Sequence, residues 1–164
     1  MAAGKFVLLV LAGAMLGAQA APSAYDLAGR FVWRHANGDV TGARFTTTDE
    51  VVIVPADRDS AYVSMALTFF NGHECSIGGM ARMEGSRLVL RDPDAQGFDG
   101  TPCRLEIWRQ GNRLRWDDGE ASCSSTCGAR GGYNNGEMRW SLRRTIPRAE
   151  QQRILADARR PRDP

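Results

Sequence analysis

Short alternating segments separated by turn residues run through most of this chain, and they restrict its fold more than any other feature. Apolar and polar residues alternate within these segments, which is the period of a strand with one buried face. Between 29 and 143 no segment shows a helical period. Residues that favour tight hairpin turns separate the segments at Asn37-Gly38, Asn71-Gly72, Glu84-Gly85-Ser86 and Gly111-Asn112. The sequence therefore predicts an all-β, antiparallel protein.

Eight or nine strands are expected. They are the segments 29–35, 40–47, 51–54, 61–70, 73–83, 87–91, 103–110, 113–118 and 137–143. Eight strands that close into a barrel leave an interior that side chains fill, or that holds one small ligand. Both faces of 61–70 are apolar, which indicates a strand covered on both sides or facing a cavity. We expect an up-and-down barrel of the lipocalin kind, with a two-sheet β-sandwich as the alternative.

The hairpin around Gly111-Asn112 predicts its own register. A two-residue loop places Ile107 opposite Trp116, on the face that would join the core. The other face then carries Trp108 and Arg115 among charged residues. We expect the Trp108 ring to lie against the Arg115 guanidinium, and we count both side chains among the candidate binding residues.

The first twenty residues have the composition of an export signal. Lys5 precedes an apolar stretch at 6–16, and Ala18-Gln19-Ala20 offers the small residues that a signal peptidase recognises. A stretch of about ten apolar residues is too short to span a bilayer. We therefore expect residues 1–20 to be a signal peptide cleaved before Ala21. The mature chain would be periplasmic or secreted, without stable membrane insertion.

The end of the chain differs from the strand region. Residues 148–160 place Ile154 and Leu155 on one side among good helix formers. Residues 143–164 hold 7 Arg and 3 acids, whereas residues 21–142 hold 13 Arg and 16 acids. We expect a barrel domain at 21–144 followed by a basic helix and tail at 145–164. That helix would either lie exposed, or dock on an acidic partner or anionic lipid.

Four cysteines form an even set, and an oxidising compartment favours two disulfides. Their spacing does not give the paired Cys-x-x-Cys knuckles of a structural zinc site. Four cysteines allow three pairings. The favoured one joins Cys75 to Cys103 and Cys123 to Cys127, because the second pair lies within one Gly/Ser-rich loop. The other two pairings remain open.

The composition argues against several classes of function. The formal net charge is +2, so a dedicated nucleic-acid binder is not expected. His35 and His73 are the only histidines, and neither a Gly-x-Ser-x-Gly elbow nor a spare thiol is available. No catalytic residue, metal site or cofactor is predicted. The competing hypothesis is a carboxylate-dependent hydrolase of envelope glycan that uses Asp117, Asp118 or Glu120.

The glycine-rich segment 123–136 is the most distinctive loop. Its glycines permit left-handed backbone and the close approach of another group. Arg130 could present a fixed fork of donors to a carboxylate or phosphate, and Tyr133 is an aromatic of the type found at recognition sites. Both are candidate contact residues. Alternatively, the segment is a cross-linked Ω-loop in which Arg130 pairs with the preceding acidic cluster.

The stretch Cys123 to Gly131, Cys-x-x-x-Cys-Gly-Ala-Arg-Gly, resembles a segment of small exported proteobacterial β-barrel proteins of unassigned role. The chain is similar, more loosely, to periplasmic lysozyme inhibitors, which are small disulfide-bearing β-barrels. It lacks the Ser-Gly-Ser-Gly-type loop of the membrane-bound inhibitors, so no inhibitory residue is carried across. The resemblance implies a non-enzymatic binding protein. Its partner would be an envelope protein, such as a cell-wall hydrolase, or a small envelope ligand.

Overall fold

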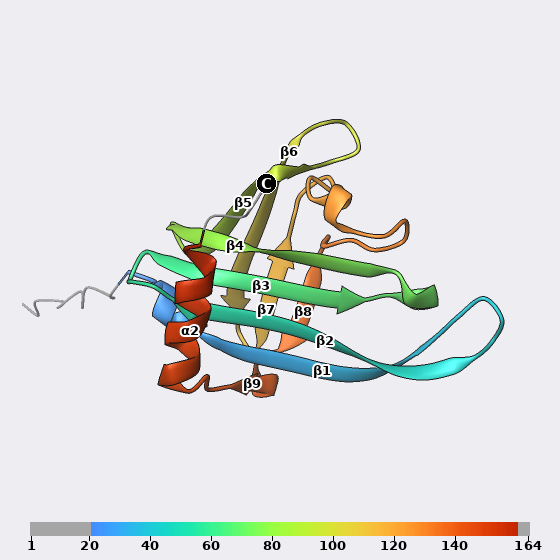
Figure 1. The fold of residues 1–164 in the computed structure, drawn as a ribbon, viewed down its shortest axis with the longest axis horizontal. Coiled ribbons are helices and arrows are strands. Elements are labelled where there is room, and N and C mark those ends of the chain that lie inside the picture. The colour runs from blue at the N-terminus through green and yellow to red at the C-terminus, as the bar shows by residue number, and fades with distance from the viewer. Residues whose placement is uncertain (1–20, 161–164) are drawn as a thin grey trace, which may run out of the picture.

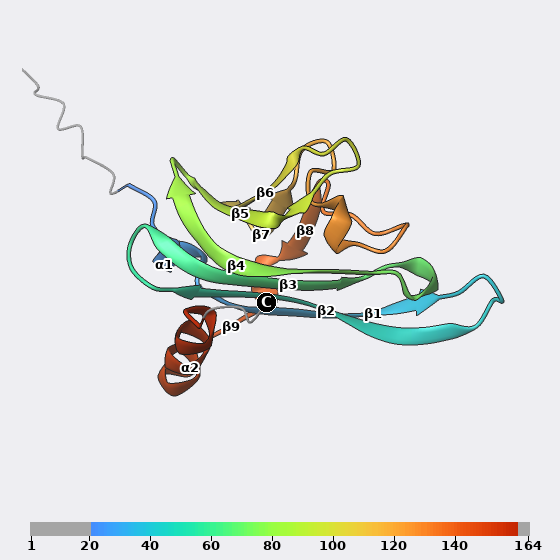
Figure 2. The ribbon, with the colours of Figure 1, turned by 45° about the horizontal axis from the view of Figure 1, so that its top comes forward.

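The computed structural model describes residues 21–160, so the predicted signal peptide and the last four residues lie outside the described part. Nine antiparallel strands form one sheet in the order β8-β7-β6-β5-β4-β3-β2-β1-β9. The sheet curls into a nearly closed barrel (Figures 1 and 2). The elements are α1 (Ala24–Leu27), β1 (Gly29–Gly38), β2 (Arg44–Pro55), β3 (Ser60–Thr68), η1 (Phe70–Gly72), β4 (Glu74–Glu84), β5 (Arg87–Gln96), β6 (Pro102–Gln110), β7 (Arg113–Asp117), η2 (Ser124–Thr126), β8 (Gly136–Arg139), η3 (Trp140–Leu142), β9 (Arg143–Arg144) and α2 (Arg148–Ala158).

A continuous apolar core fills the space that the strands enclose. Alternate residues of nearly every strand point inward and are removed from water, as a period of two requires. The largest fully buried side chains are Tyr133, Phe31, Ile53, Met65, Leu88, Leu90, Leu105, Ile107, Leu114, Val51, Val54 and Val63. The predicted all-β antiparallel barrel is confirmed, and of the two expected interiors the one packed with side chains is found.

The β6–β7 hairpin has the predicted register. Ile107 lies opposite Trp116, and both side chains are buried. Trp108 lies opposite Arg115 on the outer face, again as expected. A two-residue turn and strict alternation were therefore sufficient to place this hairpin.

The first hairpin differs from its prediction. Asn37-Gly38 ends β1 instead of forming the turn, and a single strand, β2, covers 44–47 of the predicted segment 40–47 and all of 51–54, whereas 40–43 belong to the turn. The turn occupies residues 39–43, where the Asp39 carboxylate accepts the backbone N–H groups of Thr41 (2.9 Å) and Ala43 (3.0 Å). An Asp that bonds its own following backbone can organise a longer loop, and here it outcompetes the Asn-Gly turn.

The last predicted strand, 137–143, is split in two. β8 pairs with β7, and after the 3₁₀ turn η3 the chain pairs as β9 with β1, through Arg30↔Arg144 and Phe31↔Arg143. The break occurs because the chain crosses from one edge of the sheet to the other. The barrel is closed at β9 and carries a seam between β8 and the rest of β1.

The predicted C-terminal helix is confirmed as α2, and it lies against the outer face of β2 (Figure 2). Ile154 and Leu155 pack on Val52, Val54 and Ile146, which form a small second apolar cluster. The strand below is therefore buried on both faces, which explains its unbroken run of apolar residues. Within residues 21–160, no helix is long and apolar enough to cross a membrane.

The two disulfides join Cys75 to Cys127 and Cys103 to Cys123, so the favoured pairing was wrong. The Cα atoms are 4.0 Å apart in the first pair and 4.4 Å in the second. Cys123 and Cys127 flank the turn η2, and each reaches a different strand, β6 or β4. The disulfides therefore fasten the late loop to the barrel at two points, and such bonds fit an oxidising compartment.

Candidate functional site

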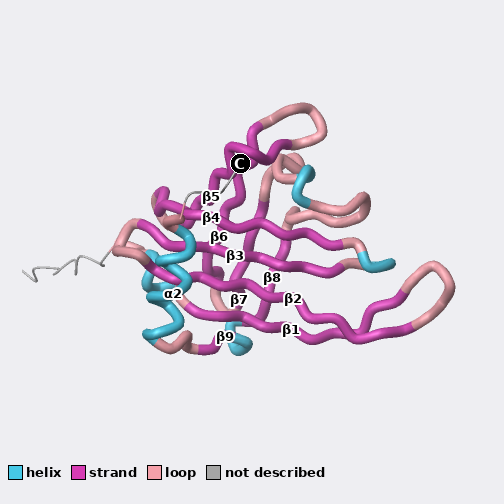
Figure 3. The backbone as a smooth tube through the Cα atoms, viewed as in Figure 1, coloured by secondary structure: helices cyan, strands magenta, loops and turns pink. Residues whose placement is uncertain are grey.

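Two hairpins extend beyond one end of the barrel (Figures 1 and 3). The β1–β2 hairpin reaches furthest, and the β3–β4 hairpin lies beside it. Their tips are linked, because Asn37 Nδ2 donates to Phe69 O at 2.9 Å and the Val40 N–H donates to Asn71 Oδ1 at 3.4 Å. We call residues 37–45 and 69–72 the projecting end.

Exposed apolar side chains gather on the projecting end. Val40 is 69%, Phe45 40% and Phe70 49% exposed. Phe70, Asp39, Gly42 and Ala43 help to line a hollow of about 460 Å³ beside the end of β1. Large apolar groups concentrated on one exposed feature mark interaction surfaces in soluble proteins. We call Val40, Phe45 and Phe70 the tip residues.

Behind the tip, the inward face of β1 and β2 carries an ordered polar cluster. His35 Nε2 lies 3.0 Å from Asp49 Oδ2, and Asp49 Oδ1 accepts the Thr68 N–H at 2.7 Å. The Trp33 ring stacks on the His35 ring with centroids 4.3 Å apart. Trp33 lies on the same face as buried Phe31, yet it is half-exposed because the strand has left the barrel there. The cluster stiffens the projecting hairpins from within.

A second candidate site lies on the outer face of β5, β6 and β7. A cleft of about 710 Å³ contains Trp108 and many charged groups, among them Arg87, Arg104, Glu106, Asp117, Asp118 and Glu120. The guanidinium over the Trp108 ring belongs to Arg87, at 4.0 Å from the ring centroid, and not to Arg115 as expected. Arg115 instead donates to Glu137 at 2.8 Å. Arg87 also pairs with Glu106 at 2.8 Å, so much of the charge in this cleft is already satisfied.

Asp118 lines this cleft but is turned into the loop. The residue is only 3% exposed, and its Oδ2 accepts the Cys123 N–H at 3.1 Å. Within the described residues its buried Oδ1 has no hydrogen-bond partner. Burial raises the pKa of the Asp118 carboxyl, because the charged form loses its hydration. One oxygen of this carboxyl therefore holds the loop backbone, while the raised pKa is a property that a general acid also requires.

We expect Asp118→Asn to stabilise the protein at neutral pH. A carboxyl whose pKa is raised by folding contributes stability below its unfolded-state pKa of about 3.9, and loses it as the pH rises through the folded-state pKa. The amide keeps the acceptor for Cys123 and never ionises. Thermal unfolding from about pH 3 to pH 8 should show equal stability in acid and a higher Tm for the variant at neutral pH. A variant less stable at every pH would contradict this.

The structure places the two loop candidates differently. Arg130 is exposed, and among the described residues no acidic side chain pairs with it. Tyr133 is fully buried, its hydroxyl lies 3.2 Å from Thr126 Oγ1, and burial raises its pKa to about 12. The expectation that Tyr133 contacts a partner is therefore wrong. The alternative, in which Arg130 pairs with Asp117, Asp118 or Glu120, is not found either.

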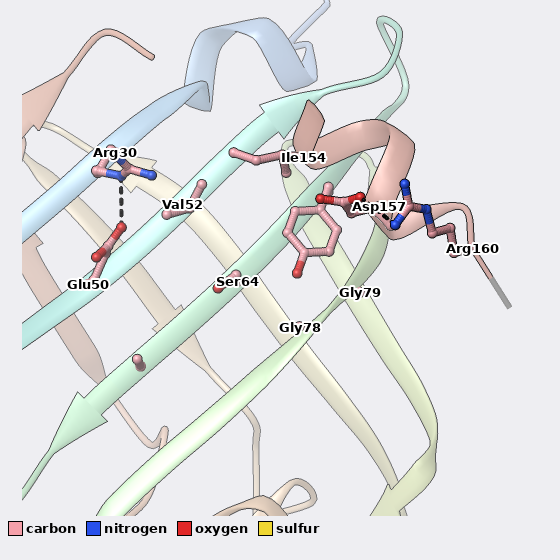
Figure 4. Close-up of a pocket in the computed structure, with 12 residues that line it drawn as sticks. Arg30, Glu50, Val52, Ser64, Gly78, Gly79, Ile154, Asp157 and Arg160 are labelled. Atoms are coloured by element: carbon pink, nitrogen blue, oxygen red, sulfur yellow. Dashed lines mark ion pairs between the residues drawn. The ribbon is translucent and has the colours of Figure 1, made fainter. Parts of the chain in front are cut away.

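A third hollow, of about 530 Å³, lies between α2 and strands β2 to β4 (Figure 4). Arg30 bridges its wall, with Nε 2.8 Å from Glu50 and a terminal nitrogen 2.8 Å from Glu150. Tyr62 and Gly78 line its floor, on the outer face of β3 and β4. The pair with Glu150 fastens α2 to the barrel, and the pair with Glu50 joins β1 to β2. Residues of this groove therefore already serve to attach α2 to the barrel.

Comparison with protein-family models, with curated proteins and with solved structures finds no match to this chain. Among residues 21–160, no three His, Cys, Asp or Glu side chains gather in a way that could hold a metal ion. Conclusions about function therefore depend on the geometry of the surface itself.

Proposed function

We propose that this chain is exported to the cell envelope and binds a protein partner there, without catalysis, through the projecting end. A cell-wall hydrolase is one such partner. The observation that carries the proposal is the exposure of Val40, Phe45 and Phe70 on two hairpins that are linked at their tips. Exposed apolar groups on a stiff support suit association, because little conformational freedom is lost on binding.

The interior of the barrel supports this choice over a ligand held inside. The core residues form one packed cluster, and a ligand within the barrel would have to displace them. A small ligand in the Trp108 cleft or in the groove under α2 is less supported. In both places, charged side chains that could bind a ligand already pair with one another. A purely structural role would leave the exposed tip residues without a purpose.

The proposed envelope location is supported by two features. The two disulfides suit an oxidising compartment, and the sequence of residues 1–20 has the pattern of an export signal. The alternative function, a carboxylate-dependent glycan hydrolase, would use Asp117, Asp118 or Glu120. It is less supported, because Asp118 is engaged in holding the loop backbone through the Cys123 N–H.

A double substitution of the tip tests the proposal. Tagged Phe45→Ser/Phe70→Ser chain should fail to capture the envelope protein that wild type captures from its own envelope extract. With the captured protein purified, calorimetry should show affinity weaker by at least about 30-fold, since a single aromatic hot spot contributes about 2 kcal/mol. Thermal unfolding of both proteins establishes that the variant is folded.

Phe98→Ser is the matched control. Phe98 is 89% exposed but lies in the β5–β6 loop, away from the projecting end. This variant should bind as wild type does. Equal capture by the wild type and the tip variant would overturn the proposal. Release of soluble fragments from purified cell wall by the wild type alone would instead favour the hydrolase alternative.

A further inference from the structure

The outer edge of β1 is mostly unpaired. All ten residues of β1 pair with β2, but β9 pairs only with Arg30 and Phe31. Within the described part of the chain, no strand therefore pairs with 32–38 on the side away from β2. In Figure 1, β9 lies along only the left portion of β1. Such an edge is a template for another strand.

The register shows which backbone groups this edge presents. The Asp39 N–H donates to Ala43 O at 3.1 Å, which continues the β1–β2 pairing and places odd-numbered residues of β1 in the hydrogen-bonded positions facing β2. The even-numbered residues Val32, Arg34 and Ala36 therefore direct N–H and C=O away from β2, and of these groups the Ala36 carbonyl also lies 3.4 Å from His35 Nδ1. Three adjacent donor and acceptor pairs are the repeat that an added strand requires.

A hollow lies beside this edge, at the seam between β1 and β8. It has a volume of about 340 Å³, and its apolar lining comes from Trp33, Met138 and Leu142. Trp33 is the β1 residue that borders the seam, on the face opposite to Arg34. A strand added to β1 would therefore direct every second side chain to the face on which this hollow lies, and the one nearest Trp33 would lie over it.

The charges around the edge indicate what kind of strand would add. Arg34 on β1 and Arg139 beside the hollow are exposed, and no ion pair to either forms among residues 21–160. Glu137 also lines the hollow, but it is paired with Arg113 at 2.9 Å and with Arg115 at 2.8 Å. β1 itself contains no acidic residue. A second copy of the chain that paired edge to edge about Arg34 would set this arginine against itself, which is unfavourable. An acidic strand would meet complementary charge instead.

We propose that the free edge of β1 takes an extended, acidic segment of the protein partner as an added strand. Backbone bonds to Val32, Arg34 and Ala36 would hold it, an acidic side chain would face Arg34, and an apolar side chain would fill the seam hollow. This is recognition by strand addition, in which main-chain bonds give affinity and pockets give specificity. The inference rests on the proposed function and names the chemistry of that partner.

A synthetic peptide tests the edge without the natural partner. The probe is acetylated and amidated Thr-Val-Glu-Val-Thr-Val-Glu-Val-Thr, which sets glutamates on one face and valines on the other. Calorimetry with the mature chain should show binding, and the same peptide with lysines for glutamates should bind at least about tenfold more weakly. Hydrogen exchange should show new protection at the amides of Val32, Arg34 and Ala36.

Two variants of the chain sharpen this test. Ala36→Pro removes an outward N–H but no bond to β2, a position at which an edge strand accepts proline, so the fold should survive and peptide affinity should fall at least about tenfold. Arg34→Glu should reverse the preference between the glutamate and the lysine peptide. Thermal unfolding of both variants confirms that they are folded.

Each result supports or overturns the proposal that the free edge of β1 binds an added strand. Absent binding, binding without protection of the three amides, or unchanged affinity of the folded Ala36→Pro variant would overturn the proposal. A wild-type dimer that Ala36→Pro dissociates would overturn it in favour of a second copy. Phe45→Ser/Phe70→Ser should bind the peptide normally. If the peptide binds and the tip variant still captures the partner, the proposed function is refuted but strand addition at β1 is not. If the tip variant loses capture and the peptide does not bind, only strand addition at β1 is refuted.

Discussion

A variant in which Cys75 and Cys127 are both replaced by alanine should be about 4 kcal/mol less stable to unfolding than the wild type. The disulfide closes a loop with a sequence separation of 52 residues, and its removal releases the entropy of that loop in the unfolded chain. The free energy of unfolding is measured by urea titration, with circular dichroism as the probe. Stability of small domains is typically about 5–15 kcal/mol, so this is a major loss.

The second disulfide provides the matched comparison. Cys103 and Cys123 are separated by 20 residues, and the same relation gives about 3 kcal/mol for their replacement by alanine. The longer loop should therefore cost more. A reversed order would indicate that packing of the buried sulfur atoms, and not loop entropy, dominates. Tandem mass spectrometry of an unreduced digest tests the pairing, with fragmentation between Cys123 and Cys127 to show which of the two sulfurs is bonded to Cys75.

Tyr133→Ala should destabilise the protein by about 3–5 kcal/mol, as expected for truncation of a large buried aromatic side chain. Tyr133 is 0% exposed and belongs to the main core. Tyr133→Phe keeps the ring and loses only the contact with Thr126, so it should cost about 1 kcal/mol. Chemical denaturation of both variants separates packing from the hydroxyl contact.

Arg130→Ala serves as the control within the same loop. Arg130 is exposed, so its replacement should change stability by no more than about 0.5 kcal/mol. A marginal effect of Tyr133→Ala would contradict the buried placement. Any binding role of this loop must therefore be tested with Arg130→Ala alone, since a variant that also removes Tyr133 would be destabilised and would confound binding with stability.

Local patterns predicted much of the fold. Alternation gave the strand region, and the Gly111-Asn112 turn gave the correct partners Ile107 and Trp116. These features depend on residues near one another in the chain. The disulfide pairing does not, because it depends on which strands η2 reaches across the barrel. The break of the last strand at Trp140 likewise depends on where the opposite edge, β1, lies.

The candidate site was harder to predict, because burial depends on neighbours as well as on pattern. Phe31 and Trp33 share one face of β1 and look equivalent in the sequence, yet only Phe31 lies within the barrel. β1 and β2 extend past the end of the barrel, whereas β7 across the barrel is short. The residues around Trp33 do not indicate how long the strands across the barrel are. Tyr133 was misplaced for a related reason. A glycine-rich loop suggested that Tyr133 is exposed, whereas two disulfides join this loop to β4 and β6 and Tyr133 is buried in the core.

The docking of α2 has a consequence for the order in which the molecule opens. The barrel is completed at β9, so everything after Arg144 can detach without breaking a strand pair. The helix rests on a small apolar cluster and on the ion pair between Arg30 and Glu150. Residues 145–160 should therefore form the least protected cooperative unit of the molecule. A protease that cannot attack the barrel would then trim the chain back toward its last strand.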